Sequence, residues 1–188
     1  RLLAQVHHLR HLGLHTKRQF IRFDDTFYFC AHTTILLHAR LVQSLHEIKL
    51  RSLRIRALTD SPSAFGSTLD VTLQRPLADW EYMLRADGNP FFVYEVDGQV
   101  HGLAGGFVPE EPGVVHLVSM WIDPAHRGRG VSDALVRHVI EWAASIGATR
   151  VSLECTEGNA HAEALYVRHG FRRTGTAAPR ERDGAMEF

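Results

Sequence analysis

The chain has 188 residues, of which 45% are hydrophobic and 22% are charged, the proportions of an ordinary globular domain. Its 21 Lys and Arg residues balance its 21 Asp and Glu residues, which argues against a protein that holds nucleic acid through a basic surface. Two cysteines are too few for a secreted disulfide scaffold. No apolar run reaches the roughly 18–20 residues that cross a bilayer, and no secretory signal is recognisable, so we expect a cytoplasmic protein with no membrane partner.

The first 32 residues differ in composition from the rest of the chain. Seven of the 13 histidines lie within the first 46 residues, and His7, His11 and His15 have the spacing of one helix face. Three imidazoles in a line do not surround a zinc ion tetrahedrally, and neither Cys nor carboxylate lies among them. We therefore interpret residues 1–32 as a leader or appendage, disordered or foreign to the domain, and predict no metal site. An appendage that binds nucleic acid or metal is the alternative.

Residues 33–188 carry regular patterns that predict one domain. In chain order we expect a strand over 33–37, helices over about 42–58 and 75–86, strands over 91–96, 100–108 and 114–122, a helix over about 131–146, a strand over 150–155, a helix over 160–169, and short strands over 171–174 and 185–188. Asp97-Gly98 is a strong hairpin signal, and Gly147 and Gly170 stand where helix C-terminal caps belong. The order predicts an α/β fold with a mixed, mostly antiparallel central sheet of six to seven strands, flanked by about four helices and containing one parallel crossover.

The segment from Arg127 to Gly130, Arg-Gly-Arg-Gly, joins a predicted strand to a predicted helix. Its glycines let backbone N–H groups approach a ligand, and the helix N-terminus adds unpaired donors and the positive end of the helix dipole. Such a loop suits a phosphate or pyrophosphate, to which the two arginines can add charge. The Gly-Lys-Ser/Thr of the nucleotide P-loop is absent, and Asp133 stands where the dinucleotide pattern requires a third glycine. Taken alone, the segment fits a surface turn equally well.

A second segment combines a helix start with an aromatic hydroxyl. Asn159 is a typical helix N-cap, and Tyr166 lies seven residues further on, two turns along the same face. From there the phenol could donate a proton to a leaving group. The alternative is a half-buried core aromatic whose hydroxyl reaches the surface.

Together, the two segments resemble the GNAT superfamily of N-acetyltransferases over about residues 33–188. The first is similar to the pyrophosphate loop of that family, Arg/Gln-x-x-Gly-x-Gly/Ala, which follows a strand ending Val/Ile-x-Pro. Here it reads Arg127-Gly128-Arg129-Gly130-Val131-Ser132, after Ile122-Asp123-Pro124. The second matches the signature Asn-x-x-Ala-x-x-Leu-Tyr-x-x-x-Gly-Phe at every fixed position: Asn159, Ala162, Leu165, Tyr166, Gly170 and Phe171. The resemblance implies the GNAT fold and a bacterial-type acetyltransferase that uses acetyl-CoA as its cosubstrate and needs no metal.

The resemblance also implies a role for each motif residue. The end of the strand before the loop would part from the next strand and hydrogen-bond the pantetheine arm through its backbone, while the loop amides would hold the pyrophosphate. The implied cofactor-binding residues are Met120, Trp121, Ile122, Arg127, Gly128, Arg129, Gly130, Val131, Ser132, Asp133, Asn159 and Tyr166. Tyr166 would protonate the departing thiolate, and Glu154, five residues before Asn159, would be the general base. A solvated Glu154, with a water taking the proton, is the alternative.

The expected reaction is direct attack of an amine on acetyl-CoA with no covalent acyl-enzyme, because the family rarely needs a nucleophile such as Cys155. Two residues depart from the family pattern: Ser132 replaces the last Gly/Ala, and the Asp133 carboxylate would repel a pyrophosphate and weaken cofactor binding. A non-catalytic acyl-CoA sensor of the same fold is therefore the rival hypothesis. The acceptor is left open as a small-molecule amine or a peptide amine, with no nucleic acid partner. A homodimer is left open as well, and the final strand looks short.

Overall fold

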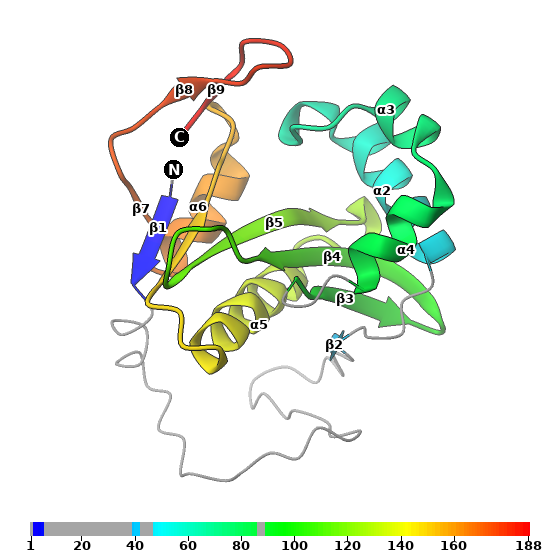
Figure 1. Ribbon diagram of the computed structural model, residues 1–188, viewed down its shortest axis with the longest axis horizontal. Helices are drawn as coiled ribbons and strands as arrows, with labels where there is room; N and C mark the ends of the chain where they lie inside the picture. Colours follow the sequence, from blue (N-terminus) through cyan, green and yellow to red (C-terminus); the bar gives the residue numbers. More distant parts are fainter. Residues whose placement is uncertain (1, 6–38, 42–46, 86–88) are drawn as a thin grey trace, which may run out of the picture.

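The computed structural model describes residues 2–5, 39–41, 47–85 and 89–188. Within these ranges, seven strands form the central sheet in the order β2-β3-β4-β5-β6-β1-β7 (Figure 1). They are β1 (Leu2–Gln5), β2 (Ala39–Leu41), β3 (Phe91–Val96), β4 (Gln99–Phe107), β5 (Val114–Ile122), β6 (Arg150–Leu153) and β7 (Arg172–Arg173). Two more strands, β8 (Ala178–Pro179) and β9 (Met186–Glu187), form a separate small sheet. Neighbours in the central sheet are antiparallel except for β5 and β6, which confirms the predicted mixed, mostly antiparallel sheet.

Helices cover both faces of the central sheet. On one face lie α2 (Glu47–Asp60), α3 (Leu69–Gln74) and α4 (Leu77–Arg85), and on the other face lies α5 (Val131–Ser145), with α6 (Ala160–Arg168) beside it (Figure 1). Two short 3-10 helices, η1 (Pro62–Ala64) and η2 (Pro124–His126), follow α2 and β5. None of the helices described here has the length and the apolar character that crossing a bilayer requires.

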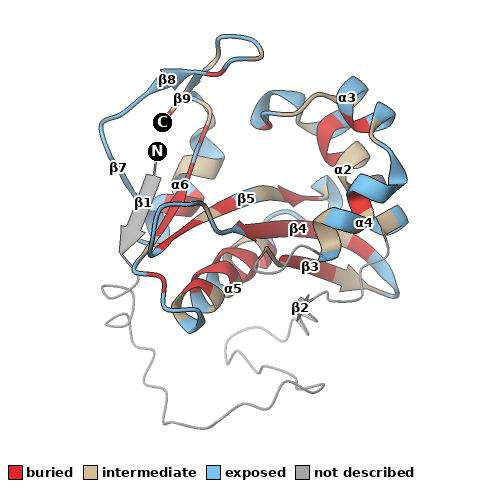
Figure 2. Cartoon of the chain, viewed as in Figure 1, coloured by how far each residue is buried: buried red, intermediate tan, exposed pale blue. Residues whose placement is uncertain are grey.

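Each face of the sheet has its own hydrophobic core. Under α5, the buried side chains of Val115 and Leu135 pack together with Leu165 of α6. Under α2 and α4, Leu53 and Trp80 pack against Leu103 of β4. Figure 2 shows α5 buried along the side that faces the sheet and exposed along the other, the amphipathic arrangement that its sequence predicts.

The β3–β4 hairpin forms as predicted because its turn residues accept left-handed backbone angles. Asp97 has a φ of 50° and Gly98 a φ of 76°, which is the combination that tight two-residue hairpins require. The helices of the first layer differ from the prediction. The helix expected over 42–58 begins at Glu47 and runs to Asp60, and a separate α3 precedes α4 because Pro76 keeps Arg75 extended between them.

The place of Leu2–Gln5 corrects the interpretation of residues 1–32 as standing wholly outside the domain. These four residues form β1, which lies inside the sheet between β6 and β7. The sequence could not show this, because so short a segment has no periodicity of its own and its partners are more than 140 residues away in the chain. The rest of that stretch, with His7, His11 and His15, the boundary after residue 32 and the strand expected over 33–37, lies outside the described residues.

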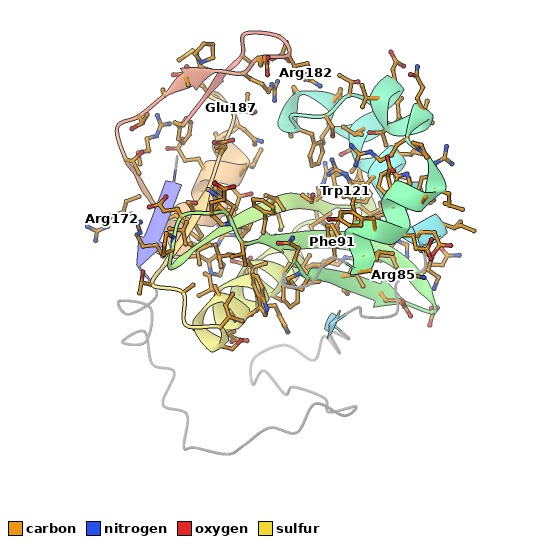
Figure 3. All side chains as sticks on the ribbon, in the orientation of Figure 1. Arg85, Phe91, Trp121, Arg172, Arg182 and Glu187 are labelled. Atoms are coloured by element: carbon orange, nitrogen blue, oxygen red, sulfur yellow. The ribbon has the colours of Figure 1, made fainter. Side chains whose placement is uncertain are left out.

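The C-terminal hairpin of β8 and β9 is held against the first helical layer by arginines. Arg180 is buried and donates to the backbone oxygens of Ser63 at 3.0 Å and Phe65 at 3.2 Å, and it also pairs with Glu187 at 3.1 Å. Arg182 donates to the backbone oxygen of Ser67 at 3.1 Å, and Figure 3 shows its side chain between the hairpin and the helices. These hydrogen bonds therefore join the segment after α2 to the last residues of the chain.

Candidate functional site

The end of β5 leaves β6 after a short paired stretch. The parallel ladder between the two strands covers only Val114 to His116. Opposite β4, the two β5 residues Ser119 and Met120 take the place of one, and Ser119 has a left-handed φ of 59°. A bulge of this kind bends the strand that carries it. Met120–Ile122 therefore lie beyond the paired stretch, at the place where the family resemblance implies that the strand parts from its neighbour.

Two glycines shape the loop that leads from β5 into α5. Gly128 has a φ of 73° and Gly130 a φ of 77°, and an added Cβ would meet nothing within 4 Å at either position. Glycine is thus required by the backbone conformation and not by crowding. Gly130 is also the N-cap of α5 and provides no side-chain acceptor. The amides of the first turn, from Val131 to Asp133, therefore receive no hydrogen bond from an N-cap side chain, an arrangement that suits an anion.

Of the two arginines in this loop, Arg127 is already engaged with other parts of the protein. Its Nε donates to the backbone oxygen of Ile122 at 3.0 Å, and its Nη2 forms an ion pair with Asp60, the last residue of α2. Asp60 also accepts a hydrogen bond from Trp121 Nε1 at 3.0 Å. Burial raises the pKa of Asp60, but its hydrogen bonds, including those from Trp121 and Arg127, outweigh burial and hold that pKa below its usual value. Arg127 thus fastens the loop to α2, while Arg129 is exposed.

A second carboxylate, Asp123, joins the start of the same loop to α2 and β4. It pairs with Arg56 of α2, lies 3.2 Å from Nδ1 of His101 and accepts the amide of Ala125 at 3.1 Å. The guanidinium of Arg56 lies 5.3 Å from the centre of the Trp121 ring. A cavity of about 280 Å³ opens here, lined by Ile55, Arg56, Thr59, Asp60, Trp121, Asp123 and Pro124. Figure 3 shows Trp121 beneath the first helical layer.

The contacts of Asp133 change the expectation that its charge repels a pyrophosphate. Arg168 of α6 donates two hydrogen bonds to its carboxylate, at 2.8 and 3.1 Å, and His169 Nε2 lies 3.0 Å from it. Burial raises the pKa of Asp133, but these hydrogen bonds outweigh burial, and the pKa is lower than usual. Asp133 therefore connects α5 to α6, and Arg168 compensates its negative charge at the first turn of α5.

Asn159 and Tyr166 stand on α6 as predicted. The Asn159 Oδ1 accepts the amide of Ala162 at 3.2 Å and caps the helix. Tyr166 has 6% of its surface exposed, so it is more deeply buried than the half-buried aromatic of the alternative interpretation. It belongs to the same hydrophobic cluster as Ile122 and Val131. Its ring lies 5.8 Å from that of Phe171, between ring centroids. Burial raises the pKa of the Tyr166 phenol, which keeps its proton at neutral pH.

Glu154 and Cys155 follow β6 directly and lie in opposite environments. Glu154 is exposed, whereas Cys155 is buried. Burial raises the pKa of the Cys155 thiol to about 11, so this residue is a neutral thiol near pH 7 and a poor nucleophile. On the neighbouring strand, His116 Nδ1 lies 2.6 Å from the hydroxyl of Ser152, just before β5 and β6 part.

Sequence reasoning missed Arg56, Asp60 and His101 as residues that position the loop. Asp60 lies 67 residues before Arg127, and Arg56 lies 67 residues before Asp123. No spacing within a motif could have indicated these pairs.

The segment that carries these residues matches a known family. A sequence model of the acetyltransferase (GNAT) family matches residues 53–171, from α2 to the residue before β7. The chain belongs to the GNAT acetyltransferase family. This match includes the loop, both of its glycines and the whole of α6, so the predicted GNAT fold is confirmed.

Individual relatives agree with this family. N-acetylaspartate synthetase of Danio rerio is 37% identical over 110 residues, which cover 58% of this chain and 39% of the relative. N-acetyltransferase 8 of Homo sapiens is 31% identical over 112 residues, covering 57% of this chain and 49% of the relative. The chain thus spans less than half the length of these curated relatives. The crystal structure of a ribosomal-protein-alanine N-acetyltransferase from Brucella melitensis has a TM-score of 0.64 and 25% identity, over 80% of this chain and 96% of that chain.

Proposed function

We propose that this chain is an acetyl-CoA-dependent N-acetyltransferase in which an amine attacks the thioester directly. The observation that carries the proposal is the parting of β5 from β6 beside the uncapped N-terminus of α5. The parted strand presents backbone groups to an extended ligand arm, and the helix N-terminus presents amides to a pyrophosphate. Acetyl-CoA has both parts and would supply the acetyl group as an activated thioester.

Two side chains have the properties that this chemistry requires. Tyr166, like any phenol, carries its proton at neutral pH and could donate it to a thiolate as it departs; burial raises its pKa, so the donation needs the thiolate to form beside it. Glu154 is exposed at the end of β6, where an incoming amine can reach it, and it or a water would accept the proton of that amine. The aspartate named in one relative makes the amino group of aspartate the first acceptor to test, alongside other small amines and peptide amines.

The environment of Cys155 supports direct transfer over a covalent acyl-enzyme. With its pKa raised to about 11, less than about one thiol in a thousand is ionised at pH 7. We expect Cys155→Ala to retain acetyl transfer. The rival hypothesis of a non-catalytic acyl-CoA sensor loses one of its supports, because Arg168 and His169 compensate the charge of Asp133.

Release of CoA against a panel of amines, measured beside acetyl-CoA binding by calorimetry, tests the proposal. Tyr166→Phe is expected to lower turnover by roughly 100-fold or more while acetyl-CoA affinity changes little. Tyr82→Phe is the matched control, because Tyr82 is 74% exposed on α4. Binding without turnover on any amine would favour the sensor, and an equal loss of affinity and turnover in Tyr166→Phe would indicate a packing role.

A further inference from the structure

His126 ends the short helix η2 and stands two positions before Gly128, the first glycine of the loop between β5 and α5. Its ring stacks on the ring of His101 of β4, with 4.1 Å between the ring centroids and 29° between the ring planes. The ring of Tyr94 of β3 meets it in a T-shaped arrangement, with 5.4 Å between the centroids. These contacts with two strands of the sheet therefore fix the point from which the glycine loop starts.

The Nδ1 atom of His126 is buried and, among the described residues, meets no hydrogen-bond partner. A neutral imidazole carries a proton on one of its two nitrogens, whereas the charged ring carries a proton on both. Whichever tautomer is present at first, protonation therefore leaves a buried N–H donor at Nδ1 without an acceptor. Because burying an unpaired donor costs free energy, the neutral ring is the form that fits this position.

The charged groups around His126 also oppose its protonation. His101, Arg129 and Arg56 disfavour a second positive charge, and only Asp123 favours one. The Asp123 carboxylate is already engaged, because it pairs with Arg56 and lies 3.2 Å from Nδ1 of His101. Burial is the largest of these effects and His101 the next, and together they hold the pKa of His126 below its ordinary value.

We propose that His126, stacked on His101, is a positioning residue for the glycine loop, and that the loop keeps its ligand-binding conformation only while His126 is neutral. The inference rests on the proposed function in one respect, namely that the ligand of this loop is acetyl-CoA. The stabilisation of the loop by the neutral ring is complete above about pH 6.5, the ordinary pKa of histidine, and is lost as the pH falls towards the lower folded-state pKa. Below about pH 6.5, a loop that has left the stack binds a proton more readily than a loop in place, so acidification favours the displaced loop.

Hydrogen exchange without any ligand tests the response of the loop itself. The amides of Ala125, His126 and Arg127 are hydrogen-bonded within η2, at 3.1, 2.8 and 3.3 Å, and their protection factors are compared at pH 7.5 and pH 5.5. His126→Phe is the decisive variant, because a phenyl ring keeps the aromatic contacts and cannot be protonated. We expect protection in the original chain to fall at pH 5.5 by at most about tenfold, since one proton with an ordinary pKa of about 6.5 is involved. In His126→Phe the protection factors should stay constant.

Calorimetry with acetyl-CoA at the same two pH values tests the consequence for binding. A phosphate group of the ligand titrates near pH 6 as well, but that change is common to all variants. We expect the Kd of the original chain to rise more between pH 7.5 and pH 5.5 than the Kd of His126→Phe, with similar values at pH 7.5. His138→Gln removes a histidine from the middle of α5 and is the matched control, which should respond to pH as the original chain does.

Constant protection in the original chain between pH 7.5 and pH 5.5 would overturn the proposal without any variant. The same pH response in the original chain and in His126→Phe would overturn it as well. So would a His126→Phe chain that loses protection and affinity equally at both pH values, because the ring would then have a packing role alone. If no variant binds acetyl-CoA at either pH, the proposed function fails, and hydrogen exchange at the three amides still decides the role of His126.

Discussion

Replacing Asp60 by Asn tests whether α2 positions the loop between β5 and α5, which we propose holds the pyrophosphate. The substitution removes the negative charge that pairs with Arg127 but keeps an oxygen that can accept from Trp121 Nε1. The side chains of Arg127 and Asp60 are 48% and 23% exposed, so solvent screens the pair, and its contribution is about 1 kcal/mol, the upper end for exposed pairs. If ordering of the loop depends on this pair, acetyl-CoA affinity falls by up to about fivefold.

Calorimetry with acetyl-CoA and thermal unfolding are the two measurements for Asp60→Asn. We expect a higher Kd for acetyl-CoA, a midpoint lower by ~2–4 °C and unchanged turnover at saturation, because Glu154 and Tyr166 lie on other elements. Glu110→Gln, on the exposed turn between β4 and β5, controls for the loss of one negative charge. A lower midpoint with unchanged acetyl-CoA affinity would refute the positioning role and leave Asp60 as a support of the fold alone.

Three further predictions concern the same region. Gly130→Ala forces an L-residue to a φ of 77°, which should lower the free energy of unfolding by about 1–2 kcal/mol. The affinity for acetyl-CoA should fall as well, and an unchanged urea midpoint would contradict the expected loss of stability. Arg168→Gln should weaken acetyl-CoA binding by exposing the charge of Asp133, and adding Asp133→Asn should restore it; a double variant no better than the single one would argue against charge repulsion. The folded-state pKa values of Asp60 and Asp123 are lowered, so their stabilisation is present above about pH 4 and lost as pH falls through the folded-state values. Urea unfolding from pH 7 to pH 3 should therefore show the difference between the original chain and Asp60→Asn shrink, and a constant difference would contradict the pKa direction.

Much of the site could be predicted because its requirements are local. Gly128 and Gly130 are recognisable since left-handed backbone angles favour glycine, and Asn159 is recognisable since a helix start needs an acceptor for its first amides. The same holds for the Asp97-Gly98 turn, which sets the register of the β3–β4 hairpin. In each case the residue type is set by the backbone angles or hydrogen bonds of residues within a few positions of it.

The electrostatic character of the site could not be predicted in this way. From sequence, Arg127 is a charge for the phosphates and Asp133 is a repulsive one, but folding pairs the first with Asp60 and the second with Arg168. Both pairs join residues more than 30 positions apart. The charge that Arg127 or Asp133 presents to a ligand therefore depends on a residue that lies far away in the sequence.

The sequence by itself therefore determined the fold class, the glycine loop after β5 and the helix that carries Tyr166, because short-range backbone geometry restricts which residues can stand there; the family was indicated by the resemblance of two motifs. The tertiary structure alone decided which charges are compensated, how deeply Tyr166 is buried and that Leu2–Gln5 belong to the sheet. These depend on contacts between distant segments, and a strand of four residues acquires its place from the hydrogen-bonding groups of its neighbours and not from any pattern of its own.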